Sequence, residues 1–236
     1  VFKIQANMDP NHRDRIAFAR ICSGKLVRGM RLKQVRTGKI IPLHAPQFFF
    51  ARDRQIADEA YAGDVVGIPN HGTLRIGDTL SEDEDINFVG VPYFAPEILR
   101  RVRLDDAMKA KKLRQALQEL AEEGVVQLFR PQDGAPPIVG VVGTLQLDVL
   151  VARLMGEYGV KIGFEQTPYS LARWVSGEKG ALAKFVAENR TAMADDVDGD
   201  PVFLASSAFM MRRTADLYPG LGFRDIKDFK VERPAA

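Results

Sequence analysis

Five basic residues within twelve positions give the sequence its strongest chemical signal: Arg28, Arg31, Lys33, Arg36 and Lys39. Arg52 and Arg54 follow in the next predicted loop. Guanidinium and ammonium groups on neighbouring loops bind the phosphates of a nucleic acid, in contacts that salt weakens steeply. The pattern therefore predicts an RNA-binding or ribosome-binding face, and an ordinary solvated basic surface stays open as the alternative.

The distribution of charge along the chain favours the same interpretation. The whole sequence of 236 residues has a formal net charge of only +2. Residues 1–80, however, carry 13 Lys and Arg against seven Asp and Glu, whereas residues 81–236 carry 20 against 24. A basic N-terminal third predicts an anionic partner for that part of the chain.

The aromatic run Phe48-Phe49-Phe50 lies close to these basic residues and could stack on nucleobases. Successive side chains of a strand point to opposite faces, so a contiguous run cannot face one ligand. At least part of the run is therefore expected in the core.

Motifs for catalysis are not found. A phosphate-binding loop needs Gly-x-x-x-x-Gly-Lys-Ser/Thr, but Gly24-Lys25 is followed by Leu26 and has no glycine five residues ahead. Without such a loop, Asp64-Val65-Val66-Gly67 indicates the edge of a strand. Ser206-Ser207 has no flanking glycines of a nucleophile elbow and is expected to cap a helix. No catalytic residue is predicted.

Metal and thiol chemistry is not predicted either. His12, His44 and His71 have no ligand spacing, and the single cysteine, Cys22, is expected to be a small core residue in a reducing compartment. The acidic run from Asp195 to Asp200 lacks the Gly and Glu positions of an EF-hand loop. It is expected to be a solvated linker, so no metal and no cofactor is assigned to this chain.

The elements that would position the basic residues are short strands. Alternating apolar residues separated by Gly-containing turns over the first 80 positions predict an all-β barrel or sandwich. The acidic stretch Ser81–Asp85 then breaks the pattern. We place a domain boundary there, which gives domains 1–85 and 86–236.

The second domain is expected to be α+β. Its periodicities predict the order β-α-β-β-α-β over about 94–166, a ferredoxin-like plan, with an α/β extension over about 167–230. The first helix should begin at Asp105/Asp106 and end at Gly124, and the second should run from Thr144 to Tyr158. The inner apolar stripes of these helices are expected to contain Met108, Leu113, Leu117 and Leu120, and Leu145, Val149 and Ala152.

Several segments resemble known translation factors. Residues 15–24 (RIAFARICSG), 62–68 (AGDVVGI) and 76–80 (IGDTL) are similar to the start and end of the EF-Tu domain-2-like β-barrel of translational GTPases. Residues 136–165 resemble the third domain of the elongation factor G group, where Gly-Glu-Leu-His-Leu-Glu is typical. Here the segment reads Gly-Thr-Leu-Gln-Leu-Asp, and with residues 94–97, 120–124 and 172–175 it resembles bacterial peptide chain release factor 3.

This resemblance implies a function. Members of the family are cytoplasmic, ribosome-associated GTPases that promote dissociation of the codon-reading release factors in translation termination. Their GTP or GDP, with Mg, binds an N-terminal domain whose motifs do not occur in this sequence. The chain is therefore expected to be a fragment that is not itself an enzyme. Its expected role is to contact ribosomal RNA and ribosomal proteins and to relay conformational change from the missing GTPase domain.

Two alternatives remain open at this stage. The chain could be the corresponding fragment of another translational GTPase, such as elongation factor G, although residues 172–175 (ARWV) speak against it. It could also be a stand-alone RNA-binding β-barrel module. A hydrolase or metalloenzyme is not favoured, because no set of acid, base, nucleophile or ligand residues converges in the sequence.

Overall fold

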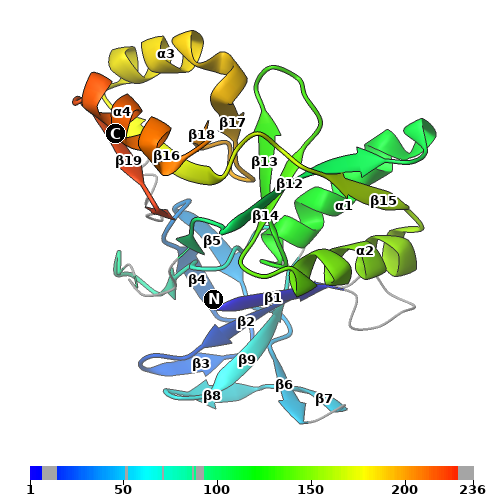
Figure 1. Ribbon diagram of the computed structural model, residues 1–236. Coiled ribbons are helices and arrows are strands. Elements are labelled where there is room, and N and C mark those ends of the chain that lie inside the picture. The colour runs from blue at the N-terminus through cyan, green and yellow to red at the C-terminus, as the bar shows by residue number, and fades with distance from the viewer. Residues whose placement is uncertain (7–14, 51–52, 71, 87, 89–92, 228–236) are drawn as a thin grey trace. The chain divides into compact units, whose positions relative to one another are not determined.

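The computed structural model divides into two compact units, which are described separately. It describes residues 1–236 except 7–14, 51–52, 71, 87, 89–92 and 228–236. The first unit comprises Val1–Val91 and the second Pro92–Asp228 (Figure 1). Together they form a mixed α+β structure that is mostly sheet and has four α-helices in its described part, so the predicted α+β class is confirmed.

The described part of the first unit contains strands only. They are β1 (Lys3–Ala6), β2 (Arg15–Arg20), β3 (Lys25–Val27), β4 (Arg31–Gln34), β5 (Lys39–Pro42), β6 (Gln47–Phe50), β7 (Asp53–Ile56), β8 (Glu59–Tyr61), β9 (Val65–Pro69) and β10 (Leu80–Ser81). These form a five-stranded sheet β1-β2-β9-β6-β7, a three-stranded sheet β10-β4-β5 and the pair β3-β8.

All three sheets contribute to one apolar cluster. Ile4 and Val66 come from the large sheet, Leu32 from β4, and Leu26 and Ala60 from the pair β3-β8. Each of these residues alternates with an exposed or half-buried neighbour, which is the period of a strand with one buried face. The short strands are therefore stabilised by a shared core and not by their own length.

The second unit carries all the helices. Its elements are β11 (Tyr93–Phe94), β12 (Ile98–Leu104), η1 (Ala107–Lys109), α1 (Ala110–Glu122), β13 (Gln127–Pro131), β14 (Ile138–Val141), α2 (Leu145–Tyr158), β15 (Ile162–Glu165), β16 (Leu171–Gly177), α3 (Lys179–Glu188), η2 (Arg190–Ala192), β17 (Met193–Asp195), β18 (Pro201–Ala205), α4 (Ala208–Leu217), β19 (Leu221–Arg224) and β20 (Ile226–Lys227). An eight-stranded sheet runs in the order β15-β12-β14-β13-β17-β18-β16-β19, and β11 pairs with β20.

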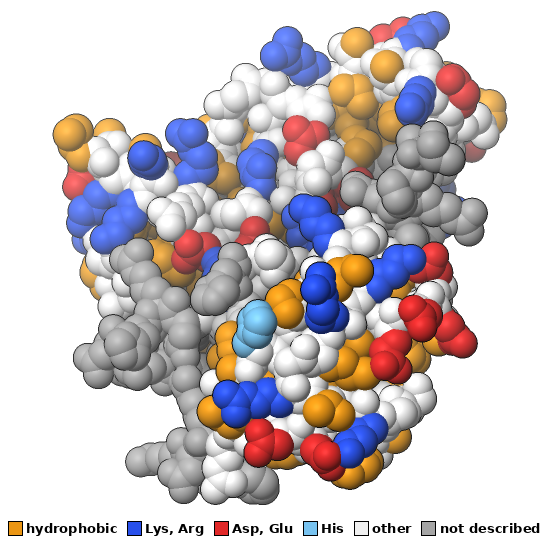
Figure 2. All heavy atoms as spheres, turned by 180° about the vertical axis from the view of Figure 1, so that it is seen from behind, with side chains coloured by type: hydrophobic (Ala, Val, Ile, Leu, Met, Phe, Trp, Pro, Cys, Tyr) orange, Lys and Arg blue, Asp and Glu red, His pale blue; other side chains and the backbone are white. Residues whose placement is uncertain are grey.

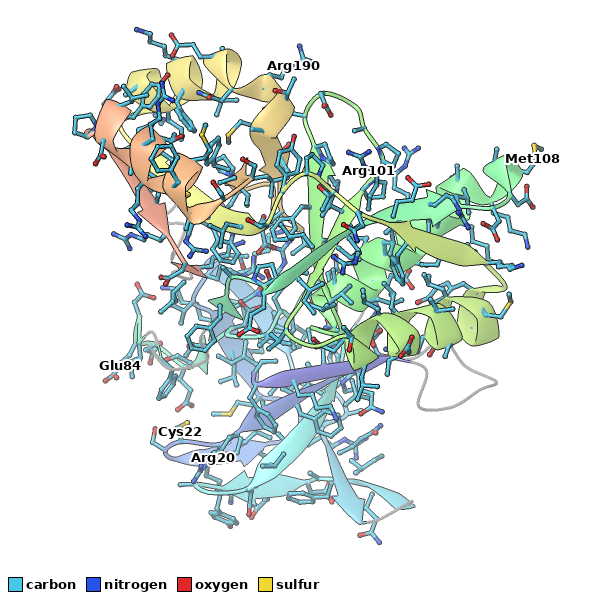
Figure 3. The ribbon with its side chains drawn as sticks, viewed as in Figure 1. Arg20, Cys22, Glu84, Arg101, Met108 and Arg190 are labelled. Carbon is cyan, nitrogen blue, oxygen red and sulfur yellow. The ribbon has the colours of Figure 1, made fainter. Side chains whose placement is uncertain are left out.

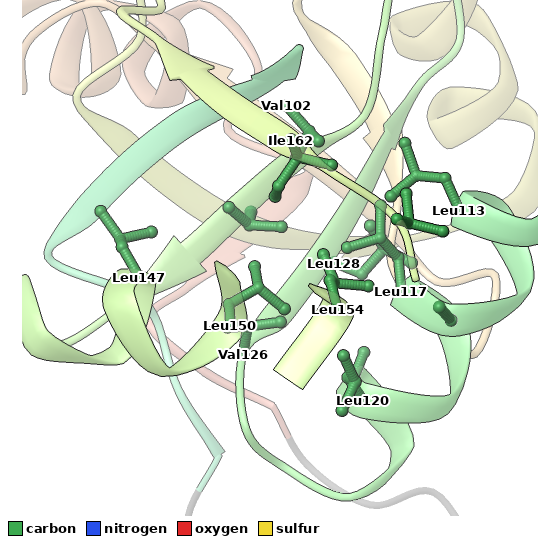
Figure 4. Close-up of a cluster of buried hydrophobic side chains, with 14 of the residues drawn as sticks. Val102, Leu113, Leu117, Leu120, Val126, Leu128, Leu147, Leu150, Leu154 and Ile162 are labelled. Carbon is green, nitrogen blue, oxygen red and sulfur yellow. The ribbon is translucent and has the colours of Figure 1, made fainter. Parts of the chain in front are cut away.

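One half of this sheet is covered by α1 and α2. The helices and the even-numbered face of β12 enclose a cluster that includes Val102, Leu117, Leu128, Leu150 and Leu154 (Figure 4). Along residues 98–165 the elements follow one another as β-α-β-β-α-β, and each neighbouring strand pair is antiparallel. Two helices on one face of an antiparallel sheet are a standard two-layer arrangement.

The other half has its own helical layer. Helices α3 and α4 pack on β16, β18 and β19 around Phe185, which makes edge-to-face contacts with Phe203, Tyr218 and Phe223. The opposite faces of both sheet halves meet in a third cluster, with Leu99 and Phe129 from one half and Trp174 and Leu204 from the other. The extension over about 167–230 is thus continuous with the preceding sheet.

The apolar stripes of α1 and α2 differ from the expectation. Met108 belongs to the 3₁₀ turn before α1 and is 93% exposed, so it is not part of the inner stripe, whereas Leu113, Leu117 and Leu120 are. In α2 the buried residues are Leu147, Leu150, Leu154 and Tyr158. The predicted stripe Leu145, Val149 and Ala152 faces outward. Helix α2 is apolar on two faces, and periodicity alone does not decide which one meets the sheet.

Two glycines explain local features of this unit. Gly159 ends α2 with φ +60°, a left-handed conformation that costs little only for glycine. At Gly140 on β14, an added Cβ would lie 2.5 Å from Pro96 Cγ and 2.8 Å from a ring carbon of Phe129. The absence of a side chain there lets the segment before β12 pass over the strand.

Candidate nucleic-acid interface

The outer face of β4 carries two of the predicted RNA-contact residues. Arg31 and Lys33 are two residues apart and so share a face, while Leu32 and Gln34 between and after them are buried. The exposed Ile40 of β5 lies opposite Lys33 in the ladder. Lys33 Nζ contacts Asp85 Oδ1 at 2.6 Å. Among the described residues, no ion pair of Arg31 is formed, so its guanidinium is available to an external anion.

Arg28 and Lys39 lie at the two ends of this hairpin. Arg28 precedes β4, donates from Nε to the carbonyl oxygen of His44 at 3.2 Å, and has Asp58 Oδ1 at 3.6 Å from Nη1. Both side chains of that pair are at least half exposed, so it contributes little to stability. Lys39 is exposed at the start of β5. The structure thus places Arg28, Arg31, Lys33 and Lys39 on one hairpin.

Arg36 has a different role from its neighbours. Its guanidinium forms a bidentate pair with Asp78, at 2.6 Å from Nε to Oδ1 and 3.0 Å from Nη2 to Oδ2. Asp78 is buried and also accepts from Gln34 Nε2 and from the backbone N–H of Arg75. Such a pair fixes the turn between β4 and β5 against the segment before β10. Arg36 is therefore held by an internal ion pair.

The remaining residues of the predicted face are only partly described. Arg52 and the side chain of Arg54 lie outside the described residues, as do the side chains of Phe49 and Phe50. Phe48 is half-buried and packs against the core of the first unit. This agrees with the expectation that part of the aromatic run belongs to the core.

Neither histidine nor cysteine builds a site in the described part of the chain. His44 is exposed, while His12 and His71 lie outside the described residues. Cys22 is also exposed, so the expectation of a small core residue was wrong. It follows the end of β2, where the strand leaves the core. Ser207, in contrast, caps α4 as expected, since its hydroxyl accepts from the N–H of Met210 at 3.2 Å.

The acidic run was expected to be a solvated linker, and this was wrong. Lys227 reaches into it and places Nζ at 2.6 Å from Asp196, 2.7 Å from Asp198 and 2.8 Å from Asp200. Asp196 is buried and also accepts from the indole N–H of Trp174 at 2.9 Å. We call this group, Lys227 with the three aspartates, the lysine clamp.

The lysine clamp accounts for its own charges. Burial alone would lower the pKa of Lys227, but the attraction of Asp196 and the hydrogen bonds to the three carboxylates outweigh it and raise the pKa above the ordinary value. Within the described residues, these aspartates are the one group of His, Cys, Asp and Glu close enough to hold a metal ion. Their charge is already balanced in part by an ammonium from the same chain.

Sequence reasoning missed the lysine clamp because its parts are far apart along the chain. The alternation of Asp196, Asp198 and Asp200 was visible, but Lys227 lies 27 to 31 residues later, on a strand of two residues. Nothing in the local pattern around Lys227 indicates a buried partner. Only pairing of β20 with β11 brings it to this place.

A second surface of interest is the outward face of α2. Leu145 is 77% exposed, Val149 and Met155 are each 48% exposed, and Ala152 is exposed between them. The cation near this face, Arg153, is already held by Glu157 and by the buried Glu123. We call Leu145, Val149, Ala152 and Met155 the outer α2 face. A nearly uncharged apolar helix face of this kind is typical of protein contacts.

No helix in the described part of the chain has both the length and the apolar character needed to cross a membrane.

Comparisons with known proteins agree with this architecture. Residues 1–83 match the family described as elongation factor G domain 2. A crystal structure of a protein from Thermus thermophilus is similar with a TM-score of 0.60 and 22% sequence identity, over 82% of this chain and 29% of that one. At this identity the likeness concerns the fold alone, and the chain spans less than a third of that protein.

The second domain gives the most specific match. Residues 88–215 match the family described as class II release factor RF3, C-terminal domain. This range contains the whole β-α-β-β-α-β segment and the strands and helices that follow it, up to α4. Because the match covers more than half of the residues, the chain belongs to the class II release factor RF3 family, through that family's C-terminal domain.

Proposed function

We propose that this chain is the ribosome-binding and conformational-relay part of a class II peptide chain release factor, a GTPase of translation termination. The single observation that carries the proposal is the match of residues 88–215 to the C-terminal domain of that family. In this proposal residues 1–85 form an EF-Tu domain-2-like barrel and residues 86–236 a ferredoxin-like domain with its extension. The intact factor would act in the cytoplasm and promote recycling of codon-reading release factors.

The GTPase activity is assigned to a separate domain. Neither matched family is a GTP-binding domain, and the sequence has no phosphate-binding loop. GTP or GDP with Mg would therefore bind the N-terminal domain of the longer protein. A switch of this kind needs an element whose equilibrium the nucleotide biases. The two units described here, joined through an acidic segment, would be that element.

The functional experiment is a recycling assay on ribosomes that retain a codon-reading release factor after peptide release. The chain extended by its GTP-binding domain should accelerate dissociation of that factor in the presence of GTP. The 236-residue chain alone should bind ribosomes without accelerating dissociation, and in excess it should inhibit the extended protein. If the extended protein left dissociation unchanged, the assignment to termination would be wrong, and a translocation assay would test the elongation factor G alternative.

The basic hairpin of the first unit supplies a prediction for ribosome binding. Changing Arg31→Gln and Lys33→Gln together should weaken binding at moderate salt by about tenfold and reduce the slope of log K against log salt by about two, because two phosphate contacts are lost. Sedimentation of the chain with ribosomes over a series of KCl concentrations measures both quantities.

A matched control is available on another sheet. Lys3→Gln with Arg20→Gln removes the same charge from β1 and β2, where both side chains are exposed. We expect this control to bind almost like the unchanged chain. Equal weakening by the two double variants would mean that general charge, and not the β4 face, governs binding. Arg36 is avoided because its loss would break the buried pair with Asp78.

The outer α2 face is proposed as the contact for the GTP-binding domain, since its apolar and nearly uncharged character suits a permanent domain contact better than a nucleic acid. In the longer protein, Leu145→Asp should leave folding of the second unit intact but release the GTP-binding domain. Limited proteolysis and small-angle scattering of the longer protein would detect the release. An unchanged proteolysis pattern and an unchanged radius of gyration would contradict this contact.

A further inference from the structure

The second unit has a concentration of positive charge where α1 begins. Six cations lie there: Arg103, Lys109, Lys111, Lys112, Arg114 and Lys161. We call them the basic helix tip. Only two carboxylates, Asp105 and Asp106, accompany them in the intervening segment. This local excess is notable because residues 81–236 as a whole carry more acids than bases.

Contacts hold the members of the basic helix tip together. Asp105 lies 3.6 Å from Arg103 Nε and 3.7 Å from Lys161 Nζ, so it links the end of β12 to the segment before β15. Lys109 donates to the carbonyl oxygen of Gly159 at 2.7 Å, which ties the 3₁₀ turn to the end of α2. The charges thus belong to one end of the domain and not to separate loops.

Three members of the basic helix tip have unused charge. Lys111, Lys112 and Arg114 are exposed on the first turns of α1, and no ion pair of theirs exists within the described residues. The N-terminal end of a helix adds a positive dipole to such side chains. Viewed from behind, Lys and Arg side chains gather at this edge of the unit (Figure 2), and Met108 is at its tip (Figure 3).

We propose that the basic helix tip binds the phosphate backbone of RNA, as a contact separate from the β4 face. This inference rests on the proposed function, because it takes ribosomal RNA as the source of the phosphates. Four of the six cations are lysines, which are depleted in protein interfaces but bind phosphates well as point charges. Met108 is the one large exposed apolar residue in segment 103–114, so a protein or a membrane would find no broad apolar anchor.

The test removes charge without disturbing the helix. Lys111→Gln, Lys112→Gln and Arg114→Gln exchange residues of similar helix propensity, and Lys109 is retained because it bonds Gly159. If all three contact phosphates, the slope of log K against log salt for ribosome binding should fall by about two units. The control Lys179→Gln, Lys184→Gln and Arg212→Gln removes three exposed charges from α3 and α4 and should leave the slope unchanged.

The outcomes separate this inference from the proposed function. If the unchanged chain binds ribosomes and the triple variant has the same slope as its control, the inference is wrong while the proposed function stands. If the unchanged chain does not bind ribosomes, the proposed function is wrong and this inference is wrong with it. A third arm uses vesicles of phosphatidylcholine and phosphatidylserine. Loss of vesicle binding by the triple variant, with ribosome binding unaltered, would also overturn the assignment to RNA.

Discussion

Replacing Lys227 by methionine is expected to lower the free energy of unfolding of the second unit by about 3–5 kcal/mol, the usual cost of removing one member of a buried charge group. Lys227 is 8% exposed, and Asp196 and Asp198 are also largely shielded from water. Without the ammonium, three carboxylates whose oxygens lie within 4.8 Å of one another would repel. The methionine side chain retains most of the apolar stem but offers no proton.

The only tryptophan of the chain makes this loss directly measurable. Trp174 donates its indole N–H to Asp196, so its fluorescence reports on the lysine clamp and on the second unit alone. Urea denaturation followed by this fluorescence should show a lower midpoint for Lys227→Met, with a red-shifted emission in the folded state. Lys161→Met is the control, since Lys161 is 72% exposed and its pair with Asp105 is 3.7 Å long. It should cost less than about 1 kcal/mol.

The contribution of Lys227 depends on pH in a defined direction. Its folded pKa is raised above the ordinary value of 10.5, so the stabilisation is fully present below that value and is lost as pH rises through the higher folded pKa. Between about pH 6 and 9 the ammonium is charged in both the folded and the unfolded chain. The difference between the unchanged chain and Lys227→Met should therefore stay constant over that range. A steep decrease within it would mean that another group titrates.

Leu150→Ala should be the most damaging single truncation in α2, at about 2–5 kcal/mol, whereas Leu145→Ala should change the free energy of unfolding by less than about 0.5 kcal/mol. Leu150 is fully buried in the cluster between α2 and the sheet (Figure 4), where truncation leaves a cavity. Leu145 is 77% exposed, so its methyl groups are already in water. The chemical change is the same at both positions, and only burial differs.

Urea denaturation followed by Trp174 fluorescence also measures this pair, since Trp174 lies in the same unit as α2. The two variants should give transitions of equal slope and different midpoints. The sequence-based expectation, which placed Leu145 inside, predicts the reverse order. A larger cost for Leu145→Ala than for Leu150→Ala would therefore contradict the observed packing of α2.

Local patterns were sufficient for the elements of the second unit. The cap at Asp106, the left-handed Gly159 and the capping Ser207 are properties of a few adjacent residues, and each is found at or near the predicted helix end. Strand β12 likewise follows from alternation, since Ile98, Val102 and Leu104 face one cluster as the period of two requires. Strand β17, hidden in what the sequence suggested was a linker, has only three residues and too short a period to detect.

Long-range contacts decided the properties of the candidate sites. Arg36 and Arg31 have the same charge and lie five residues apart, yet one is bound to Asp78 and the other is exposed. Spacing along the sequence cannot distinguish them, because Asp78 reaches Arg36 only after β10 pairs with β4. Cys22 is a similar case, since its exposure depends on where β2 ends and not on its residue type.

By itself, the sequence determined the α+β class, the basic character of the first 80 residues, the positions of the four helices and the resemblance to translation factors. All of these depend on neighbouring residues or on short motifs. The tertiary structure alone decided which face of α2 is buried, which arginine is free to bind an anion, and that Lys227 neutralises the acidic run. The physical reason is that burial and charge pairing are set by residues distant in the chain, and local periodicity contains no information about those partners.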